Sequence, residues 1–165
     1  PDHKYAYSIR GHSGDSNCVE VVRWNKPPTS RGDRLKVLQR MVAHSQFCDS
    51  GDTTISATRR AVKDVVSRRS VDGEETSKGL GVALSDANFR RYGLDPLDWA
   101  VALAGAESSV DGYAVMIGSL GDEAARVSAA LPKGRGHVAD SSEDIPVILK
   151  KVLRHAGVLQ DDSSI

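Results

Sequence analysis

The chain has 165 residues, 39% of them apolar and 27% charged, and its 22 basic residues balance its 22 acidic ones. These values suit one soluble globular domain, and no apolar run approaches the roughly 18 residues of a membrane span. A formal net charge of zero removes the positive field that non-specific nucleic-acid binding requires, so we expect no nucleic-acid partner. Two cysteines are too few for a disulfide framework, which favours an intracellular, reducing compartment.

The first third of the chain predicts two strands followed by two helices. Runs of β-branched and aromatic residues at 4–9 and 18–24 flank a turn rich in Gly, Asp and Ser, which is typical of a hairpin. A helix capped by Asp33 or its neighbour is expected to end near 44–47, and a second helix is expected to end near Arg69. The apolar residues that recur at helical spacing in the first helix are Leu35, Leu38, Met41 and Val42.

Strands and helices alternate in the rest of the chain. Short apolar runs at 80–84, 110–117 and 137–139 are typical of buried parallel strands, and each is followed by a helical pattern. This alternation predicts an α/β fold with a Rossmann-like, doubly wound, mostly parallel sheet and one antiparallel edge strand from the hairpin.

Polar residues gather in the loops expected at the carboxyl ends of the parallel strands, where ligands bind in such sheets. Mg²⁺ prefers oxygen ligands, which Thr54 at a helix start and Asp86 after a strand would supply. Two ligands are too few, and both residues could instead be local caps of a helix and a turn. The other polar residues on these loops are His12, Ser13, Asp15, Asp52 and Thr53.

Other residues allow other chemistries. His12, His44 and His137 could collect on zinc, and Cys48 with His44 could form a nucleophile and its base. Histidines of this kind are more often ordinary hydrogen-bonded side chains, and a cysteine near a helix end is more often a small buried hydrophobe. The two tryptophans are expected to fill the core or a groove rather than to bind a ligand.

Two segments resemble the von Willebrand factor type A domain family. The sequences GDTT at 51–54 and LSDAN at 84–88 are similar to the second and third elements of the family's metal-ion-dependent adhesion site. Longer segments are similar to the A domain at the C-terminal end of a large mitochondrial ATPase of the AAA+ class, and they lie at 11–15, 34–54, 84–96, 117–135 and 144–152. The resemblance covers almost the whole chain, as a partial domain at 1–156 followed by a flexible tail at 157–165.

The resemblance implies a divalent cation such as Mg²⁺, held by Thr54 (with Thr53 as the near alternative) and Asp86. It implies a protein partner that supplies an acidic residue, or the ATPase ring of the parent protein. A mitochondrial location is also implied. ATP binding and hydrolysis would belong to upstream modules, since no G-x-x-x-x-G-K-[ST] sequence occurs here, and this chain is expected not to be an enzyme. The expected partner-binding rim consists of His12, Ser13, Asp52, Thr53, Arg91 and Tyr92.

The chain departs from the family in one respect. The family's first element, Asp-x-Ser-x-Ser after a central strand, does not occur in the sequence, which begins at Pro1. We therefore expect a fragment that lacks the central first strand and its helix, with the strand supplied by an upstream segment or another chain. Two alternatives remain, namely a Mg²⁺-dependent phosphoryl-transfer or hydrolase domain, and a structural cap with a degenerate metal site.

Overall fold

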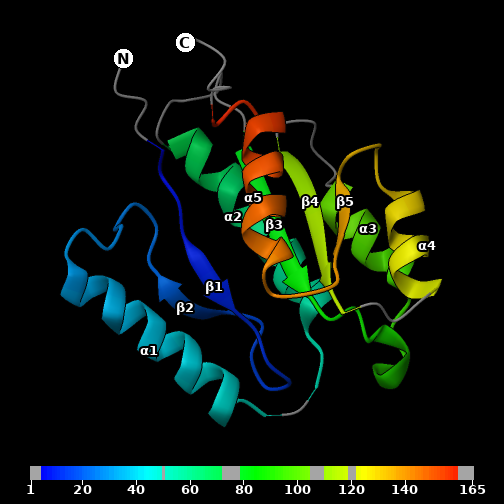
Figure 1. Ribbon diagram of the computed structural model, residues 1–165, viewed down its shortest axis with the longest axis horizontal. Helices are drawn as coiled ribbons and strands as arrows, with labels where there is room; N and C mark the ends of the chain where they lie inside the picture. The colour runs from blue at the N-terminus through cyan, green and yellow to red at the C-terminus, as the bar shows by residue number, and fades with distance from the viewer. Residues whose placement is uncertain (1–4, 50, 72–78, 105–109, 119–121, 160–165) are drawn as a thin grey trace. The chain divides into compact units, whose positions relative to one another are not determined.

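A computed structural model describes residues 5–49, 51–71, 79–104, 110–118 and 122–159 (Figure 1). The chain divides into two compact units, Pro1–Ala57 and Thr58–Ile165, and each is described by itself. Most of the predicted polar loop at 70–77 and the end of the predicted tail lie outside the described residues. None of the described helices is both long enough and apolar enough to cross a membrane.

The first unit contains the predicted hairpin. Strands β1 (Ile9–Gly11) and β2 (Val19–Val22) pair antiparallel, with Gly11 opposite Val19, and the pairing shifts by a bulge after Ile9. Both strands are shorter than the sequence pattern indicates. Among the described residues these two strands form a sheet of their own.

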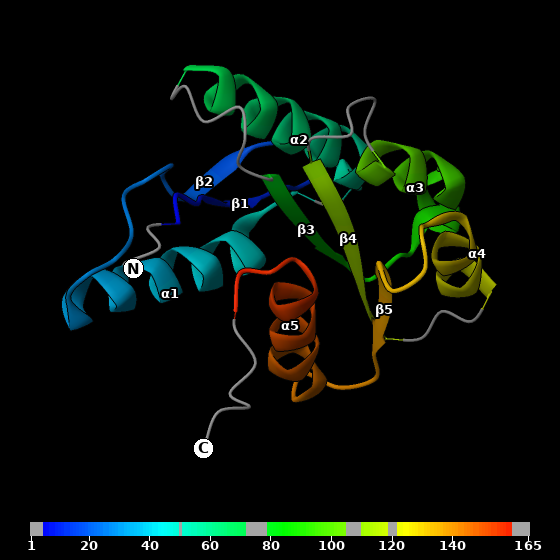
Figure 2. The same cartoon turned by 90° about the horizontal axis from the view of Figure 1, so that it is seen from above.

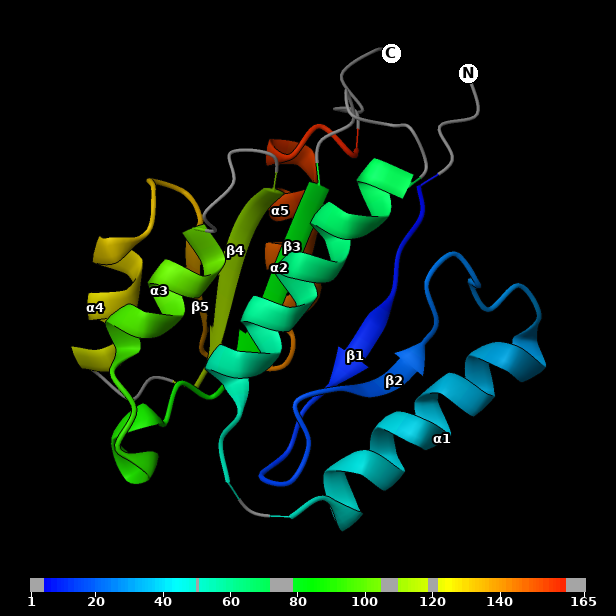
Figure 3. The same cartoon turned by 180° about the vertical axis from the view of Figure 1, so that it is seen from behind.

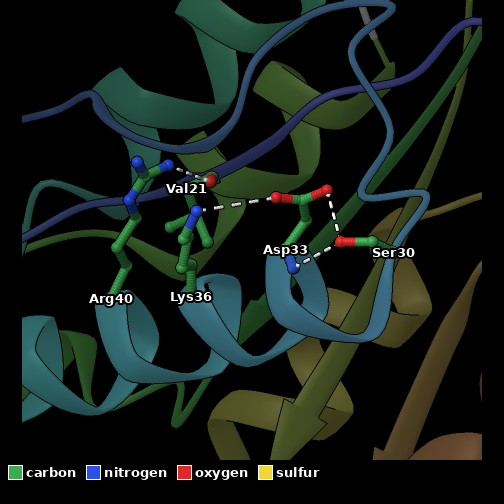
Figure 4. A network of polar contacts seen from close by, with 5 residues as sticks. All are labelled: Val21, Ser30, Asp33, Lys36 and Arg40. Carbon is green, nitrogen blue, oxygen red and sulfur yellow. Dashed lines mark hydrogen bonds and ion pairs between the residues drawn. The ribbon is translucent and has the colours of Figure 1, made fainter.

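Helix α1 (Arg31–Phe47) follows the hairpin and begins with a reciprocal cap. The hydroxyl of Ser30 accepts a hydrogen bond from the Asp33 backbone N–H at 3.0 Å and donates to the Asp33 carboxylate at 2.7 Å (Figure 4). This arrangement satisfies an N–H group that a helix start leaves unpaired. The helix therefore starts slightly before Asp33, at the residue after Ser30.

The second unit is built on a parallel sheet in the order β3-β4-β5. Strand β3 (Gly79–Ser85) pairs along its whole length with β4 (Val110–Ile117), and β5 (Gly136–Ala139) pairs with the second half of β4. All three strands were predicted from their apolar runs. The α/β, Rossmann-like class is thereby confirmed.

Helices cover both faces of this sheet (Figures 2 and 3). Helix α2 (Thr54–Val71) begins in the first unit and continues into the second, where it lies with α3 (Pro96–Ala104) on one face. Helix α5 (Asp144–His155) lies on the other face, and α4 (Asp122–Ala130) packs beside α3 and β5. A short 3-10 helix, η1 (Phe89–Tyr92), follows β3.

Each face of the sheet has its own apolar core. On the side of α5, side chains alternate inward from the strands and meet the helix, and the cluster consists of Tyr113, Val115, Ala139, Ile148 and Val152. On the other side Trp99 is fully buried, its ring centroid lies 5.3 Å from that of Phe89, and its indole N–H donates to the Thr58 hydroxyl at 3.0 Å. Trp99 is thus a core residue, as the sequence predicts.

Candidate metal site

In the first unit the hairpin turn and the loop before α2 are fastened together. The Gly14 N–H donates to the Asp49 carbonyl at 3.1 Å, and the Thr53 hydroxyl donates to the Ser13 carbonyl at 2.7 Å. Gly51 has a φ of +147°, and a Cβ at this position would lie 2.6 Å from the Cα of Gly14. Only glycine allows this approach of two backbones. The hairpin turn and the loop before α2 therefore lie together, as the sequence predicts.

The two threonines of the candidate site have different roles in this structure. The Thr53 hydroxyl lies within hydrogen-bonding distance of two backbone carbonyls, at 2.7 Å from that of Ser13 and 3.2 Å from that of Ser16. The Thr54 hydroxyl instead lies 3.3 Å from Nε2 of His12. Because Thr53 serves to hold the two loops together, Thr54 is the better candidate for a metal ligand.

Asp52 caps helix α2. One of its carboxylate oxygens accepts the backbone N–H of Thr54 at 2.6 Å, which stabilises a helix start. Asp52, which the sequence analysis assigns to the partner-binding rim, is therefore also a cap of helix α2.

His12 and Ser13, the remaining rim residues of this unit, are held within the hairpin turn. The His12 carbonyl oxygen lies 3.0 Å from Nε2 of His44. The Ser13 hydroxyl hydrogen-bonds the Asp15 carboxylate, and this bond lowers the pKa of Asp15 from its ordinary value. The turn thus carries an ionised carboxylate at neutral pH.

In the second unit Asp86 follows directly after the carboxyl end of β3. It is exposed, and one of its carboxylate oxygens accepts the Asn88 N–H at 3.2 Å. The neighbouring Ser85 hydroxyl accepts the Ala87 N–H at 3.1 Å, and Ala87 has a φ of +54°. This tight turn holds the Asp86 carboxylate at the carboxyl end of β3, which is where the sequence predicts it.

Glu123 supports the segment after Asp86, and the sequence analysis missed it. It is only 5% exposed, and its carboxylate accepts the backbone N–H groups of Phe89 at 3.0 Å and Arg90 at 3.3 Å. The Arg90 guanidinium lies 3.4 Å from the same carboxylate. An acidic residue in the first turn of a helix is common because of the helix dipole, so nothing in the sequence marked Glu123 as different from Asp122.

Replacing Glu123 with alanine is expected to destabilise the second unit by about 2 kcal/mol, because one buried and one partly buried N–H group would lose a charged acceptor. The melting temperature should fall by about 5 °C or more. Thermal unfolding followed by circular dichroism measures both. Asp122→Ala, at the exposed neighbouring position, is the matched control and should change the melting temperature much less. Equal effects of the two substitutions would show that the Glu123 contacts do not stabilise the turn.

Arg91 and Tyr92 belong to η1, a few residues after Asp86. Both are exposed, and the Arg91 guanidinium lies 5.6 Å from the centroid of the Tyr92 ring. Glu123 fixes the start of this short helix through Phe89 and Arg90, and the two rim residues follow directly. Asp86 and the two rim residues therefore lie in one short stretch of the second unit, and Glu123 holds the part of it that forms η1.

Thr54 belongs to the first unit and Asp86 to the second, so the structure describes two parts of a candidate site separately. A hydroxyl and a carboxylate are hard oxygen donors that fit Mg²⁺, although two ligands are too few for a complete site. No group of three His, Cys, Asp or Glu side chains suited to a metal occurs in the described parts of the chain. The zinc interpretation of His12, His44 and His137 therefore gains no support there.

The chain is similar to a known protein over most of its length. The chain is 40% identical over 151 residues to the von Willebrand factor A domain-containing protein 8 of Mus musculus, and this alignment covers 92% of the chain. The chain is a von Willebrand factor A-like domain related to that protein. No protein-family profile matches the sequence. No solved structure matches it significantly.

The von Willebrand A-like domain described here spans about 8% of the length of that relative. In the described residues, the parallel sheet of three strands and the antiparallel pair agree with the Rossmann-like fold of such domains.

Proposed function

We propose that this chain is a metal-dependent docking module, in which a divalent cation such as Mg²⁺ binds Thr54 and Asp86 and is completed by a carboxylate of an acidic partner protein. The observation that carries the proposal is the exposed Asp86 carboxylate, which a tight turn holds at the carboxyl end of β3 in a von Willebrand A-like domain. A cation with an unfilled position favours a charged oxygen over water, so such a site binds acidic partners selectively.

The proposal includes a further strand that carries the Asp-x-Ser-x-Ser element. Strand β3 pairs with β4 on one edge, and its other edge has no strand partner among the described residues. Its sequence, GLGVALS, contains no charged residue and no proline, which are the residues that protect a natural sheet edge. An upstream segment or another chain would pair with this edge and bring the remaining metal ligands to the site.

The related protein suggests the wider context of the module. We propose that the parent is a mitochondrial AAA+ ATPase, that ATP is hydrolysed in its upstream modules, and that this domain is a non-catalytic part of it. The partner carboxylate would then belong to a client protein or to the ATPase ring of the parent. The absence of a G-x-x-x-x-G-K-[ST] sequence in the chain agrees with this division of roles.

The experiment is a binding assay with the full-length protein and a panel of fluorescent acidic peptides. Each peptide has a matched version in which Asp and Glu are replaced by Asn and Gln. With Mg²⁺ present, we expect at least one acidic peptide to bind about tenfold or more tightly than its neutral version, since a carboxylate completes the cation's ligands. EDTA should remove this difference. Binding that is unchanged in EDTA would contradict the proposal.

A further inference from the structure

His137 on strand β5 faces the side of the sheet that helix α5 covers. Its neighbour Gly136 faces the opposite side, because a Cβ on Gly136 would lie 2.8 Å from the hydroxyl oxygen of Ser128 in α4. Successive residues of a strand point to opposite faces, so His137 points toward the face of α5 (Figure 2). Val115, its partner in the register with β4, belongs to the apolar core on that face. The imidazole therefore lies where the sheet meets α5.

The Nε2 atom of His137 lacks a hydrogen-bond partner among the described residues, although it is inaccessible to solvent. The other ring nitrogen, Nδ1, remains for the hydrogen bond between this ring and the Gly134 backbone, which raises the pKa of His137. A bond with this effect is one in which the ring N–H donates, so the neutral ring keeps its lone pair on Nε2. A further proton would thus enter at a buried atom, and its N–H would have no acceptor there.

The surroundings of His137 oppose a positive charge on its ring. Burial is the largest cause that lowers the pKa of His137, because it removes the water that would solvate the cation. Lys151 and His155 lie one turn apart on α5, and their charges lower this pKa further. The groups of α5 that act on the imidazole are therefore both basic.

The other charged groups on this face are already paired. Asp111 at the start of β4 accepts a hydrogen bond from the Arg135 guanidinium, in the turn before β5. This guanidinium lies 5.8 Å from the ring centroid of Tyr113, whose pKa is raised by burial, so the phenol is neutral. The His155 ring meets the Tyr113 ring edge-on at 5.9 Å. Because the Asp111 carboxylate already has a cationic partner, a charge on His137 would stay uncompensated.

We infer that protonation of His137 separates helix α5 from the sheet, which makes this contact an acid-sensitive switch. A buried cation without an acceptor is costly, and separation of α5 returns the ring to water. Helix α5 can leave without breaking a strand pair, and the buried side chains it contributes are Ile148 and Val152. A histidine whose pKa is lowered by folding stabilises the contact fully above its ordinary pKa of about 6.5, and this stabilisation is lost as the pH falls below that value.

Hydrogen–deuterium exchange of the full-length protein tests the inference, in EDTA so that a bound cation plays no part. Peptides that cover Asp144–His155 are compared at about pH 7.5 and about pH 5.5, after correction for the effect of pH on intrinsic exchange. A histidine that titrates near 6.5 when exposed can raise the opening of α5 by at most about tenfold over this range, and we expect a rise of about three- to tenfold. Helix α3, on the opposite face, is the internal control and should change much less.

Substitutions assign the response to one group. His137→Gln and His137→Leu remove the group that takes up the proton, and both should abolish the rise. His155→Gln, at an exposed histidine of α5, is the matched control and should keep most of it. Lys151→Glu places a carboxylate beside His137 and should reduce the rise, because the protonated ring then gains a partner. This last variant retains the test if both substitutions of His137 unfold the domain.

Three results would overturn the inference. Exchange of α5 that is independent of pH would show that acid does not separate this helix. A rise that persists in both His137 variants would assign the response to another group. An equal rise in α3 would show that the whole unit opens, rather than the contact between α5 and the sheet.

Discussion

Replacing Asp86 with alanine in the full-length protein is expected to weaken Mg²⁺ binding by about 100-fold, because the substitution removes the carboxylate that this chain contributes to the proposed site. Isothermal titration calorimetry measures the affinity directly. Asp86 also accepts a hydrogen bond from the Asn88 N–H, so alanine alone does not separate loss of a ligand from loss of the turn.

Asp86→Asn provides that separation. An asparagine side chain retains an oxygen that can accept the Asn88 N–H, but it lacks the negative charge. We expect the asparagine variant to keep the melting temperature of the unaltered protein and yet to bind Mg²⁺ almost as weakly as the alanine variant. Asp98→Ala, at an exposed position of α3, is the control for removing a surface carboxylate. Unchanged Mg²⁺ binding in both Asp86 variants would show that Asp86 is not a ligand, and no Mg²⁺ binding by the unaltered protein would favour a structural cap with a degenerate site.

Replacing Gly112 with alanine is expected to be the most destabilising single-atom addition in the second unit. A Cβ on this residue of β4 would overlap the carbonyl oxygen of Leu103 in α3 and would lie 2.7 Å from its carbonyl carbon. The obstacle is the backbone of a helix that packs directly on the sheet, so no side-chain rotation relieves it. Overpacking of this kind costs about 2 to 3 kcal/mol, which corresponds to a melting temperature lower by about 10 °C.

Gly81 offers a matched control on the neighbouring strand. A Cβ at Gly81 would lie 4.0 Å from the nearest atoms of Val110 and Val62, which is an ordinary contact distance. Gly81→Ala should therefore leave the melting temperature within about 2 °C of the unaltered value. Equal melting temperatures of Gly112→Ala and Gly81→Ala would contradict the close packing of α3 on β4.

The sheet of the second unit could be predicted because its strands are short apolar runs, of which β4 is the most deeply buried. A strand such as β4, covered by α3 on one side and α5 on the other, is almost continuously apolar, and a run like Val110–Ile117 is too short for a buried helix. The position of Asp86 followed from the end of such a strand. The hairpin was predicted in a different way, from the turn residues between two runs of β-branched and aromatic residues. Its strands are shorter than these runs.

Other features depend on contacts that sequence patterns do not contain. The spacing of Leu35, Leu38, Met41 and Val42 indicates a helix, but spacing alone does not show which side of α1 meets the hairpin. Whether Thr53 or Thr54 has the structural role depends on the position of the Ser13 carbonyl, some 40 residues earlier in the chain. These distinctions arise from tertiary packing, which overrides local pattern.

The central claim is that Thr54 and Asp86 bind one divalent cation in the complete protein. The most direct test is a crystal structure of the full-length protein grown with Mn²⁺, a substitute for Mg²⁺ whose anomalous scattering identifies it. We predict an anomalous peak bound, directly or through water, by the Thr54 hydroxyl and the Asp86 carboxylate together with an Asp-x-Ser-x-Ser loop on a strand paired with β3. A well-ordered domain with Thr54 and Asp86 far apart, or close together without a peak between them, would contradict the claim.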